Sequence, residues 1–341
     1  MFELRNIVRK NILNLKAYSS ARDEFSGTDG VFLDANENPF GELNRYPDPY
    51  QRALKEKLSE VKAIPLENIF IGNGSDEVID LAYRIFCKPG KDKALTFIPT
   101  YGMYEVSAAI NDVKLIRVPM DLTFQIDFEA SERFLEDERL KLIFICSPNN
   151  PTGNIIKDID RVLRAFKGIV FVDEAYIDFS TSDSWISKIN EYPNLIVSQT
   201  FSKAWGLASA RIGVAYANAA IISVFNKVKA PYNVSALNQK AAIDALENYS
   251  EFDKTKALIL KQKEILERIL LSTPLVKKTY PSDSNFILIE VEDANKVYNE
   301  LVSRKVITRN RNGLVKNCIR ITVGSAEENE QLITALTEIS S

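Results

Sequence analysis

The chain contains no histidine among its 341 residues. This absence excludes Ser-His-Asp and Cys-His catalytic arrangements, and it excludes any metal site that needs an imidazole ligand. If the chain is an enzyme, its proton-transfer groups are therefore Lys, Tyr, Asp, Glu or Cys side chains, or groups of a bound cofactor. We expect no metal site.

Cysteine and long apolar runs are also scarce. Cys87, Cys146 and Cys318 lie far apart, each beside apolar residues. This spacing favours a reducing compartment, which we take to be the cytoplasm, over a disulfide framework or a zinc knuckle. No apolar run approaches the roughly 18 residues that a membrane span needs, so we expect no membrane association. The first 18 residues lack the apolar core of a secretory signal.

The overall charge gives no sign of a nucleic-acid partner. The net charge is -3, and no basic stripe is interleaved with aromatic residues. Apolar residues make up 45% of the chain and charged residues 26%, which is typical of a globular protein. The length favours about two domains.

A repeated pattern of short apolar run, polar turn and helical stretch extends from about residue 66 to 216. Such runs suit strands that are buried on both faces, and their alternation with helices predicts a mostly parallel α/β sheet with helices on both faces. The predicted strands are NIFIG (68–72), KALTFI (93–98), VKLIRV (113–118), LKLIFIC (140–146), GIVFVD (168–173), NLIVSQT (194–200) and RIGVAY (211–216).

The C-terminal part of the chain has a different pattern. Residues 254–272 have the apolar spacing of a long amphipathic helix, and the helix predicted at 293–305 lies between apolar runs at 285–291 and 318–324. This predicts a smaller α+β domain. We therefore divide the chain into three parts: 1–40, an N-terminal arm or part of the small domain; 41–235, the large domain; and 236–341, the small C-terminal domain.

Chemically useful side chains follow the predicted strands. Ligands of open α/β sheets bind beyond the carboxyl ends of the strands, so these residues are candidates for one site. A glycine-containing turn before a helix is in addition an anion site, because free backbone N–H groups and the helix dipole point there. The candidates are Ser75, Asp76, Tyr101, Asn150, Asp173, Tyr176, Thr200, Ser202, Lys203 and Arg211.

Each candidate taken singly also has an ordinary structural explanation. Ser75 could cap the start of a helix and Asp173 the end of a strand, and Tyr101 could be a packed aromatic residue. Lys203 could be a solvated surface charge, and Arg211 could be one partner of an ion pair. Asn150 belongs to the stretch NNPTG (149–153), which is a turn sequence in its own right. The functional reading depends on all of them lying where one pocket would form.

Together these residues meet the needs of pyridoxal 5'-phosphate. Lys203 can form a Schiff base with the aldehyde, and burial or a nearby cation would lower its pKa. Asp173 can keep the ring nitrogen protonated, and Asn150 and Tyr176 can bind the ring oxygen. Tyr101 can stack on the ring. The phosphate can bind to the backbone N–H groups of Ser75 and Asp76, to the hydroxyls of Thr200 and Ser202, and to Arg211.

The motifs SPNNPTG, VFVDEAY and TFSKAWGLASARIG follow one another in this order, and with them the chain resembles the fold-type I aminotransferases that depend on pyridoxal phosphate. Within that family, NILNLKAYSSAR (11–22), LDANENPFG (33–41), RYPDPYQ (45–51), IPTYGMY (98–104) and CIRITVG (318–324) look like the histidinol-phosphate aminotransferase group. The resemblance covers nearly the whole chain.

The resemblance implies further site residues and a homodimer. It implies that Tyr46 reaches the cofactor phosphate of the other subunit, although a packed turn tyrosine is the alternative from the residues alone. It places substrate recognition on Arg309 and Arg320, with Tyr18 and Asn36 contributing. Fork-shaped guanidinium groups can accept both a phosphate and a carboxylate. Arg311 is an alternative to Arg309.

The implied reaction converts L-histidinol phosphate and 2-oxoglutarate to imidazole acetol phosphate and glutamate, a step of histidine biosynthesis. It would alternate between the pyridoxal and pyridoxamine forms of the cofactor, with Lys203 as the Schiff-base lysine and proton carrier.

Several other functions stay open. An aromatic or broad-specificity aminotransferase is the nearest, followed by threonine-phosphate decarboxylase, which shares the fold and a phosphate-bearing substrate. A transcription regulator with this fold would carry a DNA-binding domain, and only about 40 residues precede the large domain. A binding protein without catalysis would be expected to lack the lysine, and Lys203 is present.

Overall fold

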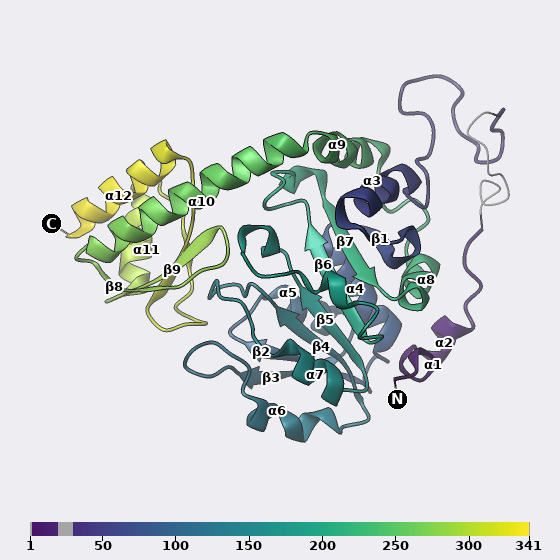
Figure 1. Cartoon of the computed structure of the whole chain (residues 1–341), viewed down its shortest axis with the longest axis horizontal. Coiled ribbons are helices and arrows are strands. Elements are labelled where there is room, and N and C mark those ends of the chain that lie inside the picture. The colour runs from purple at the N-terminus through teal and green to yellow at the C-terminus, as the bar shows by residue number, and fades with distance from the viewer. Residues whose placement is uncertain (1, 20–29, 341) are drawn as a thin grey trace.

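The structure is a computed structural model that describes residues 2–19 and 30–340. A seven-stranded sheet forms the core of the larger body, and a four-stranded sheet lies beside it, at the left of Figure 1. The strands of the large sheet are β1 (Ile69–Asn73), β2 (Lys93–Ile98), β3 (Lys114–Pro119), β4 (Leu140–Cys146), β5 (Ile169–Asp173), β6 (Leu195–Thr200) and β7 (Ile212–Ala217).

The large sheet is mostly parallel, as the sequence predicted. The strand order is β1-β7-β6-β5-β4-β2-β3. The pairs from β3 across to β6 are parallel, whereas β7 runs antiparallel to both β6 and β1. Every predicted strand of this sheet begins and ends within one residue of the observed one.

Both faces of the large sheet are covered by helices, which is why its inner strands are largely apolar, whereas the edge strand β3 is partly exposed and contains Lys114 and Arg117. Successive side chains of a strand point to opposite faces. Val170 and Val172 therefore pack in one core, and Ile169 and Phe171 in the other. The first core is bordered by α3 (Arg52–Lys62), α6 (Phe128–Leu135) and α7 (Ile159–Ala165), and the second by α4 (Ser75–Phe86), α5 (Met103–Ile110) and α8 (Ala219–Val228).

The N-terminal segment packs on the second of these cores. Helices α1 (Leu4–Ile7) and α2 (Lys10–Leu13) bring Val8 and Ile12 into it, and the Arg9 N–H donates to the Ile85 carbonyl over 3.0 Å. The described part of the first 40 residues thus meets the large body near its start and then leads away along its edge (Figure 1).

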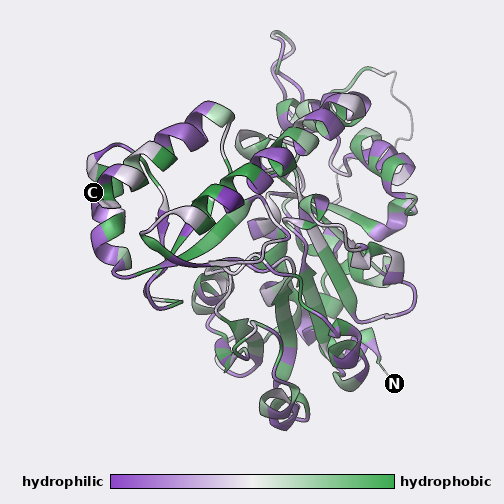
Figure 2. Ribbon diagram, turned by 60° about the vertical axis from the view of Figure 1, so that its left-hand side comes forward, coloured by the Kyte–Doolittle hydropathy of each residue, from purple (hydrophilic) through white to green (hydrophobic). Residues whose placement is uncertain are grey.

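The smaller body consists of an antiparallel sheet with one face covered by helices. Its strands are β8 (Val276–Tyr280), β9 (Phe286–Val291), β10 (Arg309–Asn310) and β11 (Cys318–Thr322), in the order β10-β11-β9-β8. Its core residues Ile287, Ile289, Ile319 and Ile321 pack with α10 (Tyr249–Ser272), α11 (Ala294–Ser303) and α12 (Ala326–Ser340). Figure 2 shows the apolar strands inside and the polar outer sides of the helices.

Helix α9 (Ala236–Glu247) lies beside α3 of the large body, and the long α10 leads from it to the small sheet (Figure 1). The division of the chain at residues 40 and 235 stays a prediction. Sequence reasoning did not identify strand β8 or helix α12.

Candidate active site

One pocket lies at the carboxyl ends of the parallel strands, and it gathers the candidates drawn from the strand ends. All ten of them line it, together with Cys146, Ala175 and Ala208. The pocket residues are Ser75, Asp76, Tyr101, Asn150, Asp173, Tyr176, Thr200, Ser202, Lys203 and Arg211.

The register of the sheet brings these residues together. In the paired strands β4, β5 and β6, Cys146 lies opposite Asp173, and Asp173 lies opposite Ser198. Parallel strands that stop at the same level place their following loops at one edge of the sheet. Asn150, Tyr176 and Lys203, which follow these strands, therefore converge there.

Asp173 is the acidic group at the floor of the pocket. It is 2% exposed, and it accepts hydrogen bonds from the Tyr104 hydroxyl at 2.8 Å and the Ala175 N–H at 3.1 Å. Burial raises the pKa of Asp173 to about 6, although the two hydrogen bonds favour its charged form. A buried carboxylate of this kind gains stability from a cation in contact with it.

Lys203 places an amine in the same pocket. Part of the residue is exposed, whereas its amine is surrounded by protein atoms, and its Nζ lies 5.7 Å from the Tyr176 ring centre. Desolvation and then the Arg320 guanidinium lower the pKa of Lys203, while Asp173 and Asp76 oppose this shift. The lower pKa increases the share of neutral amine, which is the form that attacks an aldehyde or accepts a proton.

The start of helix α4 forms one end of the pocket. Gly74 precedes the helix with a φ of 81°, and no side chain caps the first N–H groups. Free N–H groups at the start of a 12-residue helix favour an anion. Arg211 Nη2 lies 3.4 Å from Asp76 Oδ2, and the Thr200 hydroxyl donates to the Ser202 hydroxyl over 3.0 Å.

Two glycines allow this close arrangement. A Cβ on Gly74 would lie 2.5 Å from Arg211 Nη2, so it would fill the cradle between the helix start and the guanidinium. A Cβ on Gly213 of β7 would overlap the Gly74–Ser75 backbone behind the cradle. Both positions need the absence of a side chain for the anion site to keep its shape.

The walls of the pocket are held by hydrogen bonds among the remaining candidates. The Tyr101 hydroxyl donates to Asp76 Oδ1 over 3.1 Å, and the Asn150 amide lies 3.4 Å from the Tyr176 hydroxyl. Arg320 Nη1, from the small sheet, donates to Asn150 Oδ1 over 2.6 Å. This last bond joins the two bodies directly at the pocket.

Sequence reasoning missed Tyr104 and Cys146 as parts of the site. Tyr104 is fully buried and donates to Asp173, and burial raises the pKa of its hydroxyl well above the usual value. Tyr104 lies in the first turn of α5, whereas Tyr101 precedes that helix, so no helical spacing relates the two and the sequence carries no signal for the role of Tyr104. Cys146 ends β4 directly opposite Asp173.

The arginines predicted to bind substrate lie on the small sheet. Arg309 of β10 is opposite Arg320 of β11 in the strand register, and Arg320 reaches the pocket. Arg309 is exposed, whereas its alternative Arg311 is partly buried. The structure therefore brings Arg320 to Asn150 and keeps all three guanidinium groups in one region.

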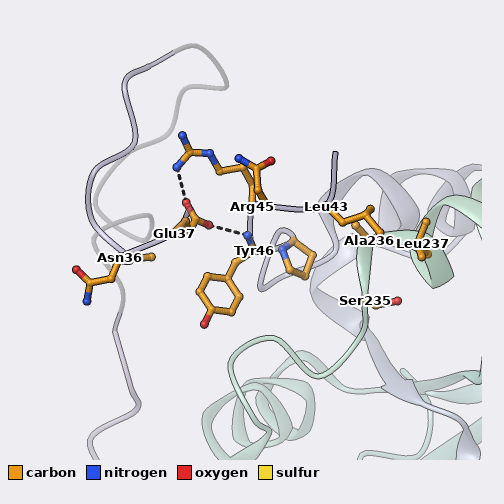
Figure 3. A pocket seen from close by; sticks show the side chains of 11 residues that line it. Asn36, Glu37, Leu43, Arg45, Tyr46, Ser235, Ala236 and Leu237 are labelled. Atoms are coloured by element: carbon orange, nitrogen blue, oxygen red, sulfur yellow. Dashed lines mark hydrogen bonds and ion pairs between the residues drawn. The ribbon is translucent and has the colours of Figure 1, made fainter. Parts of the chain in front are cut away.

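Tyr18, Asn36 and Tyr46 also lie outside this pocket. Tyr18 is 69% exposed, and Asn36 and Tyr46 line a separate cavity of about 400 Å³ with Ser235–Leu237 (Figure 3). The Tyr46 ring stacks on Tyr232 at 4.4 Å, and its N–H donates to Glu37 over 2.6 Å. Residues 20–22 of the motif that contains Tyr18 lie outside the described residues.

Two kinds of feature are absent from residues 2–19 and 30–340. No three His, Cys, Asp or Glu side chains there are grouped so that they could hold a metal ion. No helix in this part of the chain is long and apolar enough to cross a membrane.

The residues of the pocket fit pyridoxal 5'-phosphate. They supply an amine of lowered pKa, a buried carboxylate at the far side, hydroxyl and amide groups on the walls, and an anion cradle that a single Cβ would fill. An aldehyde, a ring nitrogen, a ring oxygen and a phosphate each find a matching group in this set.

Comparisons with known proteins agree with this assignment. The sequence profile of the family "Aminotransferase class I and II" matches residues 10–336. A histidinol-phosphate aminotransferase of Cytophaga hutchinsonii is 52% identical, with 98% of this chain and 99% of the relative covered. One from Bacteroides fragilis is 50% identical over 98% and 99%. The crystal structure of a Sinorhizobium meliloti histidinol-phosphate aminotransferase in complex with pyridoxal-5'-phosphate superposes with a TM-score of 0.80, at 26% identity, over 89% of each chain.

Proposed function

The chain belongs to the class I and II aminotransferase family, and we propose that it transfers the amino group of L-histidinol phosphate to 2-oxoglutarate. The products are imidazole acetol phosphate and glutamate, and the cofactor is pyridoxal 5'-phosphate. The observation that carries this proposal is the 52% identity to a histidinol-phosphate aminotransferase over 98% of the chain. We further propose that it works in the cytoplasm, because its three cysteines are unpaired and such cysteines are typical of a reducing compartment.

The pocket residues have separable tasks. When bound, the cofactor supplies an aldehyde that exchanges amines and a protonated ring that withdraws electrons from the substrate carbon. The start of α4, Arg211, Thr200 and Ser202 hold the phosphate. Asp173 holds the proton on the ring nitrogen, because its buried carboxylate is stabilised by that positive charge.

Lys203 is the residue that moves the proton. Its Nζ takes the proton from the amine-bearing carbon of the substrate, since the lowered pKa of Lys203 makes the neutral amine accessible. Tyr176 and Asn150 orient the ring from its oxygen side, and their positions depend on each other through the contact at 3.4 Å. Arg320 lies next to Asn150 and binds the anionic group of either substrate.

The function is tested by the visible absorption spectrum of the cofactor-loaded protein. L-Histidinol phosphate, added without a keto acid, is expected to convert the visible band into the shorter-wavelength band of the amine form. Conversion by phenylalanine or tyrosine but not by histidinol phosphate would instead support an aromatic aminotransferase. Release of carbon dioxide from threonine phosphate would support the decarboxylase.

We also propose that the protein is a homodimer in which Tyr46 completes the cofactor site of the partner. In its own chain Tyr46 lies in the separate cavity of Figure 3, away from the cofactor pocket. Neighbouring apolar residues of the arm are strongly exposed, namely Val31 at 88%, Leu33 at 87% and Phe40 at 81%. Contiguous exposed apolar residues mark protein interfaces.

A mixing experiment tests the action of Tyr46 across the interface. Tyr46→Phe is expected to weaken cofactor binding about 10- to 100-fold, the loss for a hydrogen bond to a charged group. A mixed dimer of one Tyr46→Phe subunit and one Lys203→Ala subunit would contain one intact site. That site lies in the Tyr46→Phe subunit, which keeps Lys203 and receives Tyr46 from the Lys203→Ala subunit. Such mixtures should regain wild-type cofactor affinity and turnover at half of their sites. No regain in mixed dimers would mean that Tyr46 serves its own chain.

A further inference from the structure

The loop of residues 149–155, which carries Asn150, is fastened to the small body by one residue. Asp283 lies in the turn between β8 and β9. Its N–H donates to the Gly153 carbonyl over 2.7 Å, and its Oδ2 accepts from the Ile155 N–H at 2.9 Å. The backbone and the side chain of Asp283 thus both bind the loop.

The two bodies meet at this contact without room for a side chain. Gly153 has a φ of 86°, and a Cβ on it would lie 2.5 Å from Ser282 Oγ and 2.8 Å from Ser282 Cβ. Glycine is therefore needed both for the backbone conformation and for the close approach. Because backbone packs here against the turn directly, a movement of the turn is passed on to the loop.

The turn that contains Asp283 is itself held firmly within the small body. Lys263 Nζ of α10 donates to the Ser282 carbonyl over 2.7 Å, and the Ser282 hydroxyl donates to the Phe286 carbonyl over 2.6 Å. Lys263 is only 9% exposed, and a charge-assisted hydrogen bond from a buried ammonium is a strong one. Asp283 therefore has a fixed place in the small body from which to hold the loop.

Hydrogen bonds across the base of the loop extend this hold to Asn150. The Asn149 N–H donates to the Asn154 carbonyl over 2.8 Å, and the Gly153 N–H donates to the Asn149 carbonyl over 2.7 Å. The side of the loop that Asp283 binds is thus bonded to the residue next to Asn150. A shift on one side of the loop must move the other side as well.

The place of Asn150 matters because its side chain meets both bodies. The amide is buried, its Oδ1 accepts from Arg320 Nη1 at 2.6 Å, and its Nδ2 lies 3.4 Å from the Tyr176 hydroxyl. Arg320 belongs to the small sheet, whereas Tyr176 follows β5 of the large one. One amide can keep both contacts only while the loop stays at a fixed position between the two bodies.

From these contacts we infer that Asp283 is a positioning residue, which holds the loop of residues 149–155 so that the Asn150 amide keeps its place in the cofactor pocket. Asp283 does not line the pocket and therefore acts through Asn150. The inference rests on the proposed function, in which Asn150 orients the cofactor ring from its oxygen side.

A double-mutant cycle between Asp283→Ala and Asn150→Ala tests this role. With Asn150 present, we expect Asp283→Ala to lower kcat for L-histidinol phosphate about 10- to 100-fold, as a displacement of about 1 Å in a catalytic site does. The dissociation constant of pyridoxal 5'-phosphate, measured by absorbance titration, should rise about 10-fold with the lost hydrogen bond. In the Asn150→Ala background Asp283→Ala should change either quantity less than about threefold, because the group through which it acts is already absent.

Further variants separate positioning from a general structural task. Asp283→Asn keeps an oxygen that can accept from the Ile155 N–H and should stay within about threefold of the wild-type values. Asp183→Ala, at an exposed position, is the control for the loss of an aspartate. Lys263→Met releases the Ser282 carbonyl and should show the same dependence on Asn150, so it provides the test if Asp283→Ala does not fold.

Losses of equal size in both backgrounds would overturn the inference, as would an Asp283→Ala variant that loses only stability in urea unfolding. The cofactor titration needs no amine substrate. If the wild-type protein failed to use L-histidinol phosphate, the proposed function would fall, whereas a loss of cofactor affinity that depends on Asn150 would still support the role of Asp283. Turnover of L-histidinol phosphate with additive losses would keep the function and overturn the inference.

Discussion

Lys203→Ala is expected to lower the steady turnover of the enzyme by at least about 10³-fold, within the range that a positioned proton-transfer group contributes. The variant should still bind pyridoxal 5'-phosphate. The phosphate cradle at α4 and the carboxylate of Asp173 come from other elements and do not depend on the lysine side chain. Loss of turnover with retained cofactor binding would show that the Lys203 amine is needed for the reaction and not for binding of the cofactor.

Stopped-flow absorbance and cofactor titration measure the two effects separately. Addition of a small primary amine should restore part of the lost rate, because it can enter the space left by the side chain and carry the proton. Lys277→Ala, at an exposed position of β8, serves as a control for the loss of one lysine. Steady multiple turnover by Lys203→Ala without added amine would contradict the role of Lys203.

Asp173→Asn is expected to reduce kcat by about 10²- to 10³-fold, as the removal of a preorganised charge at a reacting group does. The amide has no negative charge to keep the ring nitrogen protonated. It has nearly the same shape as the carboxyl group and can still bond to the Tyr104 hydroxyl and the Ala175 N–H. The expected loss therefore comes from charge and not from a change of packing.

The same substitution should make the cofactor-free protein more stable. Burial raises the pKa of Asp173 from 3.8 to about 6 in the folded protein. Between these values the folded state binds the proton more tightly, so the stability of the wild-type protein falls as pH rises. Above pH 6 the ionised carboxyl group destabilises the folded state by on the order of 1–3 kcal/mol, and Asp173→Asn removes this cost.

Urea unfolding of the cofactor-free proteins between pH 4 and 8 measures this difference. The stability advantage of Asp173→Asn should be full above about pH 6 and should disappear as the pH approaches 4. Asp183→Asn, a substitution of the same type at an exposed position, serves as the control variant. An advantage that stayed constant across this range would show that titration of Asp173 is not its cause.

The sequence predicted the large sheet and the cofactor pocket because both depend on local patterns. Near-continuous apolar runs identify strands that are buried on both faces, and in a parallel sheet the residues after such runs meet at one edge. Lys203 and Asp173 could therefore be assigned to one pocket before any contact was known. Tyr104 could not, since its importance depends on the depth at which α5 packs against β4 and β5.

Other parts of the site depend on contacts between distant segments. Whether Arg309 or Arg311 is partly buried follows from the pairing of β10 with β11, and β10 is only two residues long. The positions of Asn36 and Tyr46 depend on how the arm folds against residues 235–237, and no periodic pattern in the arm records this. Strand β8 has the sequence VKKTY, in which polar residues predominate, so an apolar-run criterion overlooks it.

The two sheets of this protein contribute different residues to the region of the pocket. The residues that line the cofactor pocket come from the large sheet and its loops, whereas the three arginines come from the edge of the small sheet. Residues 309–319 can therefore vary with little effect on the cofactor pocket, provided that Arg320, which donates to Asn150, is kept. Chimeras that exchange only this edge between related enzymes should inherit the substrate preference of the donor and the cofactor affinity of the recipient.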